Sequence, residues 1–146
     1  MQFTQPLYDP TMTQPMRDEV VALGATELRT PEEVDAALAA PGTTLLFVNS
    51  VCGCAAGGAR PALRMALQSD IKPDHVVTVF AGQDRDATQQ ARTYLPGYPP
   101  SSPQISILRD GKVVHMIQRH HIEGRTPEML AEHLKEAFKV YCAENV

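Results

Sequence analysis

Residues 44–58 have the sequence TLLFVNSVCGCAAGG, in which an apolar run leads almost directly to two thiols. The run Thr44–Val48 has the pattern of a strand that is buried on both faces. Cys52 and Cys54, separated only by Gly53, then stand where we expect a helix to begin. A helix N-terminus offers unpaired N–H groups and a partial positive charge, which favour a thiolate over a thiol. Because the thiolate is the nucleophile, this stretch predicts thiol–disulfide chemistry.

The bulk composition predicts an ordinary globular protein. Of 146 residues, 43% are hydrophobic and 21% charged, and the formal net charge is −4. This length suits one domain, residues 1–146, with residues 1–25 as an arm and helix packed on the core. The acidic balance argues against nucleic acid or an anionic membrane surface as partner. No apolar stretch reaches the roughly 20 residues that span a bilayer.

The cysteine count and the start of the chain predict a cytoplasmic location. Three cysteines, two of them nearly adjacent, do not make a secreted disulfide framework. Residues 1–6 lack the basic start and apolar core of a signal peptide. In a reducing compartment such a thiol pair is catalytic or metal-binding.

The first half of the chain carries clear start and stop signals. Prolines at positions 6 and 10 predict an extended arm over the first dozen residues, after which Pro15 opens a short helix that ends before Gly24. Thr30–Glu33 is a capping box with proline at the first helical position, which predicts a helix to about Ala40. In addition to the strand at Thr44–Val48, we expect a short strand at Thr26–Arg29 and a helix from about Cys52 to Gln68. Pro61 should either kink this helix or mark where its regular part begins.

The second half predicts a strand, a surface helix, a proline-rich turn, a hairpin and a closing helix. These lie at Val76–Phe80, Asp84–Tyr94, Pro96–Pro103, Ile105–Ile117 with its turn at Asp110-Gly111, and Thr126–Tyr141. Two parallel strands joined by a crossover helix, then an antiparallel hairpin and a helix, is the layout of the thioredoxin fold. We therefore predict an α/β, thioredoxin-like three-layer fold with a mixed central sheet and an N-terminal helical extension.

The dipeptide Ser102-Pro103 precedes the third core strand, where thioredoxin-fold proteins place a cis-proline beside the active thiols. Only X-Pro bonds adopt the cis form at modest cost, so we predict a cis bond here. The alternative is a trans proline that opens a strand. With Gly53, these two residues are the expected substrate-binding positions, because the backbone at a cis-proline can pair with a substrate disulfide as a strand does.

Three segments together resemble the bacilliredoxins, bacterial thioredoxin-fold proteins earlier described as thiol–disulfide isomerases. The segments are VNSVCGCAAG at 48–57, SSP at 101–103 and RHHIEG at 119–124. The resemblance covers nearly the whole chain. It implies that the protein reduces mixed disulfides between proteins and bacillithiol, a low-molecular-weight thiol. The implied partners are S-bacillithiolated client proteins and bacillithiol as co-substrate, with no other cofactor. The first alternative is a general protein disulfide isomerase, and the second, less favoured, is a metal-binding or redox-inert interaction module on the same fold.

The order of the two thiols indicates their roles. Cys52 lies closer to the strand end, so we expect it to be the more exposed thiol and the nucleophile. Either Cys54 or a second small thiol then resolves the mixed disulfide. A Cys-x-Cys disulfide closes a small ring, which Gly53 makes accessible and whose strain favours exchange over strong reduction. Because the flanking residues carry no formal charge, we expect the pKa of Cys52 in the upper part of the range for activated cysteines.

Other residues near the motif have simpler interpretations. Asn49 or Ser50 is expected to cap the helix and not to bond the thiolate. Three basic side chains could attract an anionic small thiol, but solvated surface charge is the favoured interpretation; they are Arg60, Arg64 and Arg119.

A metal site is the competing interpretation of the thiol pair. A closed tetrahedral site needs about four ligands, and the chain has no second cysteine pair. Cys142 falls on the apolar stripe of the last helix, so we expect a core cysteine. His120 and His121 are expected at a strand end, one packed and one solvated, and neither is assigned a catalytic role. We therefore expect no metal.

Overall fold

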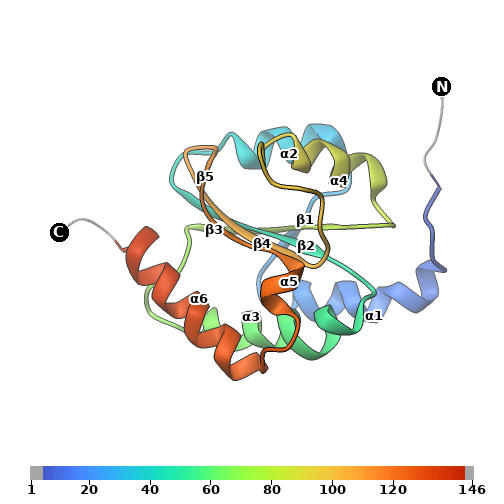
Figure 1. The fold of residues 1–146 in the computed structure, drawn as a ribbon. Coiled ribbons are helices and arrows are strands. Elements are labelled where there is room, and N and C mark those ends of the chain that lie inside the picture. The colour runs from blue at the N-terminus through green and yellow to red at the C-terminus, as the bar shows by residue number, and fades with distance from the viewer. Residues whose placement is uncertain (1–4, 144–146) are drawn as a thin grey trace.

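The computed structural model describes residues 5–143, which form a five-stranded mixed sheet between two layers of helices (Figure 1). The strand order is β1-β3-β2-β4-β5, with β1, β2 and β3 parallel and β4 antiparallel to both β2 and β5. The strands are β1 (Thr26–Glu27), β2 (Thr43–Asn49), β3 (His75–Phe80), β4 (Gln104–Arg109) and β5 (Lys112–Ile117). The predicted thioredoxin-like α/β fold is confirmed.

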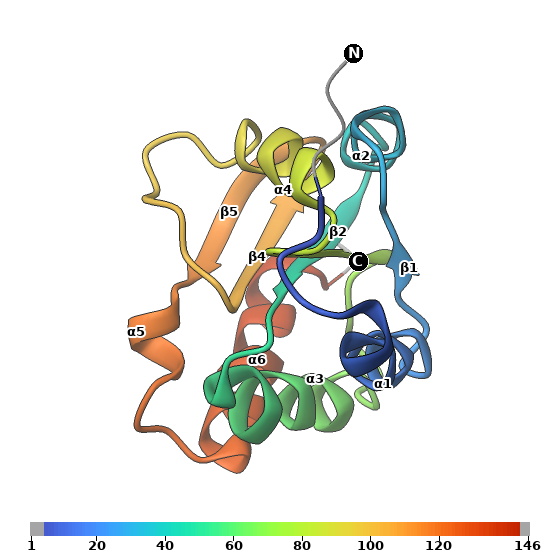
Figure 2. The same cartoon turned by 90° about the vertical axis from the view of Figure 1, so that its right-hand side faces the viewer.

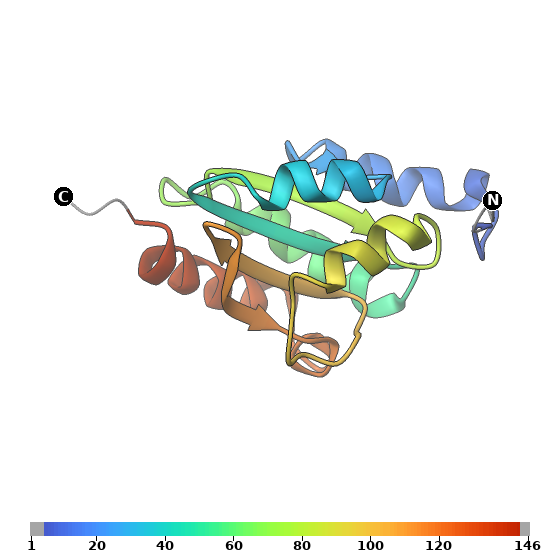
Figure 3. The ribbon, with the colours of Figure 1, turned by 90° about the horizontal axis from the view of Figure 1, so that it is seen from above.

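The helices cover both faces of the sheet, α2 and α4 on one side and α1, α3 and α6 on the other (Figures 1 and 3). They are α1 (Pro10–Val21), α2 (Pro31–Leu38), α3 (Arg60–Ala66), α4 (Arg85–Arg92), α5 (Arg119–Ile122) and α6 (Pro127–Tyr141). No helix of residues 5–143 is long and apolar enough to cross a membrane.

Strand β2 is the central element of the core, and all seven of its residues are buried. Successive side chains point to opposite faces of a strand. Leu45 and Phe47 accordingly pack with α3 and α6, whereas Leu46 and Val48 pack with α2 and α4. Each fully buried side chain of this size contributes about 1.5–3 kcal/mol. The carboxyl end of β2, where the thiols follow, is therefore held from both sides.

The N-terminal helix begins five residues earlier than the sequence predicts. Asp9 caps it, its Oδ1 accepting from the Thr11 N–H at 2.8 Å, and Pro10 occupies the first helical position. A proline is tolerated there because that N–H has no intrahelical partner. Pro15, predicted to open the helix, lies inside it. The extended arm was thus predicted too long, and its first four residues lie outside the described part of the chain.

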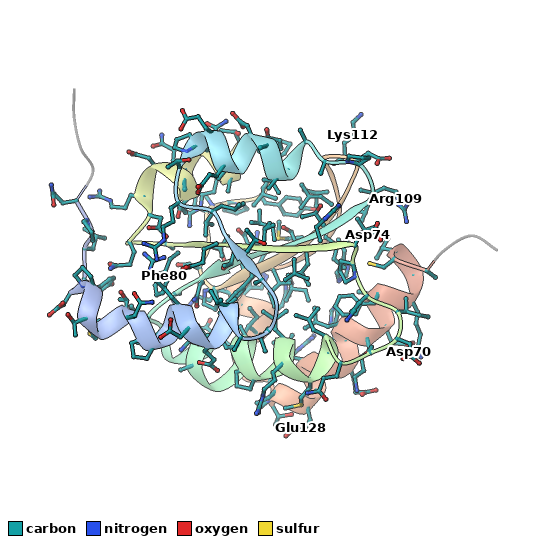
Figure 4. The ribbon with its side chains drawn as sticks, turned by 180° about the vertical axis from the view of Figure 1, so that it is seen from behind. Asp70, Asp74, Phe80, Arg109, Lys112 and Glu128 are labelled. Atoms are coloured by element: carbon teal, nitrogen blue, oxygen red, sulfur yellow. The ribbon has the colours of Figure 1, made fainter. Side chains whose placement is uncertain are left out.

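Helix α1 is attached to the sheet by a buried charge. The Arg17 guanidinium donates to both oxygens of Asp84 at 2.7 and 2.9 Å and to Glu27 at 2.9 Å. It also lies 5.1 Å from the centre of the Phe80 ring. Figure 4 shows Phe80 beside α1, at the opposite end of β3 from Asp74. The end of β3 that carries Phe80 is its carboxyl end, on the same edge of the sheet as that of β2.

The helix expected from Cys52 to Gln68 is divided in two. A π-helical segment, η1 (Ala55–Ala59), is followed by the α-helix α3. The Arg60 N–H bonds to the Ala55 carbonyl, five residues back. Pro61 has no N–H to continue such a ladder, but it suits the first turn of a new helix. Of the two effects expected of Pro61, the structure has the second: it marks where the regular helix begins.

Candidate active site

The two thiols lie at the carboxyl end of β2, beside the start of β4. Strand β2 ends at Asn49, and its antiparallel register pairs Val48 with Gln104. Pro103 immediately precedes Gln104, so it lies at the edge of the sheet from which the thiols emerge. The Ser102–Pro103 peptide bond is cis, which confirms that prediction. Cys52 and Cys54 are both free thiols.

Cys52 is surrounded by groups that stabilise its anionic form. Its Sγ accepts from the Cys54 N–H at 3.3 Å. Partial burial raises the pKa of Cys52, but hydrogen bonds from Cys54, the positive charge of Arg119 and the Ala55 N–H together outweigh it. The pKa therefore lies below its ordinary value, and Cys52 is the better nucleophile of the pair.

Cys54 is held in its neutral form. Burial raises its pKa, and so do the hydrogen bond and charge of Cys52 and the carboxylate of Glu123. The thiol donates to Glu123 Oε2 across 3.7 Å. Two thiols separated by one residue thus have pKa values shifted in opposite directions. The sequence predicts that Cys52 is the more exposed thiol. In the structure both side chains are partly buried, so exposure does not distinguish them.

Arg119 brings a positive charge to the thiols that their sequence neighbours lack. Its Nε lies 3.4 Å from Glu123 Oε2, and its guanidinium also donates to the Ser102 carbonyl at 3.4 Å. Its backbone N–H donates to Ser101 Oγ at 2.9 Å. This guanidinium therefore contacts the cis-proline loop, and its charge lowers the pKa of Cys52. Its side chain is 47% exposed, so it is a partly solvated charge, as the sequence predicts, that also acts on the thiol.

The segment that carries Arg119 is a short helix, α5, which the sequence did not predict. It follows β5 and lies beside the loop that leads into β4 (Figure 2). His121 Nδ1 accepts from the Gln118 N–H at 3.1 Å and so closes the first turn of α5. Both His120 and His121 are exposed, so the expectation of one packed histidine at a strand end is wrong.

Helix α5 approaches η1 closely because Gly58 has no side chain. A Cβ built on Gly58 would lie 3.3 Å from Ile122 Cγ2, which is tighter than ordinary van der Waals contact. Ile122 is buried in the core with Ala59 and Leu63. The absence of one methyl group therefore sets the distance between the helix that bears Arg119 and the segment that follows the thiols.

Arg60 is buried behind the thiol turn, so solvated surface charge is wrong for this residue. Its side chain is 3% exposed. It donates to Asn49 Oδ1, the Ser50 carbonyl and Glu19 Oε1, each at 2.9 Å. Ser50 Oγ in turn accepts from the Cys52 N–H at 3.0 Å, two residues on, and so forms a turn ahead of the helix. No side chain of the described residues caps the N-terminus of η1, so the capping role expected for Asn49 or Ser50 is wrong. Arg60 thus supports the residues that begin the turn.

The described residues contain no cluster of ligands that would support a metal site. No group of three or more His, Cys, Asp or Glu side chains within residues 5–143 could hold a metal ion. Cys142 is half-buried against the core cluster of α3 and α6, and burial raises its pKa. It lies at the end of α6, away from the edge of the sheet that carries Cys52.

Replacing Glu123 by glutamine is expected to lower the pKa of Cys54. Burial is the larger cause of the raised pKa and persists in the variant, but the repulsion by a carboxylate is removed. The test measures the rate at which iodoacetamide alkylates Cys54 as a function of pH, in a Cys52→Ala background. The midpoint of this pH profile should move to lower pH in the Glu123→Gln variant. Glu128→Gln, on the exposed start of α6, is the control. An unmoved midpoint would show that Glu123 does not act on this thiol.

Comparisons with known proteins match nearly the whole chain to one family. The family model described as disulphide isomerase matches residues 8–142. A bacilliredoxin of Geobacillus kaustophilus is 54% identical over 143 residues, 98% of each chain. One of Salinibacter ruber is 53% identical over 140 residues, which cover 94% of this chain and 81% of that one.

Solved structures with the same fold are much more distant in sequence. A thioredoxin of Malassezia sympodialis superposes with a TM-score of 0.57 at 10% identity, over 82% of this chain and 91% of that one. The oxidised thioredoxin of Plasmodium falciparum gives 0.53 at 14% identity, over 82% and 99%. These likenesses show the fold alone.

Proposed function

This chain belongs to the bacilliredoxin family and is a thiol oxidoreductase, and from that premise we propose that it removes bacillithiol from mixed disulfides on client proteins. The observation that carries the proposal is the set of contacts made by the two thiols: the Cys54 N–H donates to Cys52 Sγ at 3.3 Å, and the Cys54 thiol donates to Glu123 Oε2 across 3.7 Å. The pKa of Cys52 is lowered and that of Cys54 is raised, which favours Cys52 as the nucleophile and Cys54 as the reserve thiol.

The reaction begins at Cys52. Its thiolate attacks the bacillithiol sulfur of the mixed disulfide, so that the old S–S bond breaks and the client leaves as a thiolate that takes a proton from water. Cys52 then carries the bacillithiol. In this reaction Gly53, Ser102 and Pro103 are the substrate-binding positions, and their backbone polar groups pair with the incoming disulfide.

Cys54 or a second bacillithiol molecule completes the cycle. Cys54 passes its proton to the Glu123 carboxylate or to water, and its thiolate attacks the Cys52 sulfur and expels bacillithiol. A thiol reductant then supplies two electrons and reduces the Cys52–Cys54 disulfide back to the dithiol. The small number of cysteines favours a cytoplasmic location, and the cytoplasm supplies such reductants.

General disulfide isomerisation is a second candidate, favoured by the description of the matched family model. In that reaction Cys52 attacks the protein sulfur and not the sulfur of the small thiol. The same site serves both reactions, since they differ only in which sulfur accepts the thiolate.

Intact mass measurement of the Cys54→Ala variant, mixed with a bacillithiol-modified client, separates these functions. The proposal expects a mass gain of one bacillithiol, retained in Cys54→Ala/Cys142→Ala and lost in Cys54→Ala/Cys52→Ala. A covalent adduct of the whole client would instead establish the isomerase. No adduct of either kind would contradict both thiol-exchange functions.

A further inference from the structure

A cavity of about 440 Å³ lies beside the thiols, between the end of α4, the loop before the cis-proline and the start of α5. This volume falls within the usual range of about 300–1,000 Å³ for small-molecule sites. Figure 2 shows that loop and α5 side by side at one edge of the molecule. Arg119 and Glu123 line the cavity and also act on the thiol pair, so the cavity and the redox centre share a wall.

The polar groups of this cavity favour a negatively charged occupant. Three of its lining side chains can carry positive charge, Arg92, Arg119 and His120, against the single carboxylate of Glu123. That carboxylate is already engaged by Arg119 and by the Cys54 thiol. The charge that remains unmatched belongs to Arg92.

Arg92 has unused hydrogen-bonding capacity in the folded protein. Its Nε is buried without a partner, and the one hydrogen bond that its side chain makes within residues 5–143 is from Nη2 to the Ser101 carbonyl at 3.3 Å. Within residues 5–143 it forms no salt bridge, and burial lowers its pKa. A half-buried guanidinium without a carboxylate partner gains from a bidentate anion.

We propose that this cavity holds an anionic group of the low-molecular-weight thiol, with Arg92 as its main contact, while the thiol sulfur reacts at Cys52. The inference rests on the proposed function and adds a subsite and a positioning residue for that substrate. Arg92 positions the substrate and does not touch the reacting sulfur. The cavity thereby selects anionic thiols over neutral ones of similar size.

The test compares two mixed disulfides that differ in charge. In one, mercaptosuccinate is joined to 2-thiopyridine; in the other, 2-mercaptoethanol takes its place. Cys52 attacks the aliphatic sulfur, forms the new S–S bond and expels 2-thiopyridone, whose absorbance gives the rate. For the unmodified protein we expect the mercaptosuccinate compound to react faster, with the ratio of the two rates falling as salt is added. Rates measured with Cys52→Ser are subtracted.

Arg92→Gln is expected to lower the ratio of the anionic to the neutral rate by about tenfold, the equivalent of one charge-assisted contact. Arg92→Lys should fall between the two, because it retains the charge but loses the planar fork. The matched control is Arg85→Gln, at the first residue of α4, which donates to the Gln5 carbonyl and does not line this cavity. If Arg92→Gln does not fold, Arg92→Lys is compared with the unmodified protein in the same way.

The outcomes separate this inference from the function on which it rests. An unchanged ratio in a folded Arg92→Gln, or an equal loss of both rates, would overturn the anion site while leaving thiol exchange intact. A preference for an aspartate-flanked peptide disulfide without one for mercaptosuccinate would assign the cavity to the client and also overturn it. Failure of both probes to react with the unmodified protein would contradict the proposed function itself.

Discussion

Replacing Cys52 by serine is expected to reduce disulfide exchange by more than about a thousandfold. The serine hydroxyl stays protonated, so the attacking anion is lost, whereas the N–H of Cys54 and the charge of Arg119 remain in place. The measurement is the release of 2-thiopyridone from the 2-mercaptoethanol compound described above. Cys142→Ser, a thiol remote from the cis-proline, is the matched control and should retain the full rate.

The pH dependence of the same reaction gives a second check on Cys52. Its pKa lies below the ordinary value, partial burial being outweighed by hydrogen bonds and by Arg119. The rate therefore rises with pH as the thiolate forms and levels off at a lower pH than for free cysteine. A Cys52→Ser variant that kept its rate, with the loss appearing in Cys54→Ser, would reverse the assigned roles.

Replacing Arg60 by leucine is expected to cost about 2–4 kcal/mol of unfolding free energy. The substitution removes the donors to Asn49 Oδ1 and to the Ser50 carbonyl, two acceptors buried behind the thiol turn. The ion pair with Glu19 contributes little of this, because that carboxylate is 44% exposed and water can solvate it. Urea denaturation should show a lower midpoint with an unchanged slope.

Arg64→Leu is the control for Arg60, since it lies one turn later on α3 and is exposed. It should change the stability by less than about 0.5 kcal/mol. We also expect Arg60→Leu to slow the reaction of Cys52, because Ser50 holds the Cys52 N–H. Equal midpoints for the two variants would mean that the buried hydrogen bonds of Arg60 do not stabilise the fold.

The core strands and most helix starts could be predicted because their signals are local. A continuous apolar run identifies β2, and proline after threonine marks the first turns of α2 and α6. The start of α1 was wrong because two prolines compete for the first helical position. Asp9 decides for Pro10 by accepting the Thr11 N–H. Helix α5 was missed because four residues give too short a period to detect.

The candidate site was predictable only where its residues are neighbours in sequence. The type and spacing of Cys52 and Cys54 predict thiol chemistry. The position of Pro103 before a core strand predicts its cis bond, which the structure has. Arg119 and Glu123 are more than 60 residues away along the chain, and only the fold brings them to the thiols. Arg92 was not singled out, because an arginine on a polar helix resembles any surface residue.

The contact between Gly58 and Ile122 has a consequence for how such a sequence can change over time. A methyl group at position 58 would lie 3.3 Å from Ile122 Cγ2, so an alanine there requires Ile122 to shift slightly, and a smaller residue at 122 removes that requirement. Gly57, one position earlier, has nothing within 4 Å of a Cβ and is under no such constraint. Positions 58 and 122 should therefore vary as a pair among relatives, and the thiol-bearing and charge-bearing segments are inherited as one unit.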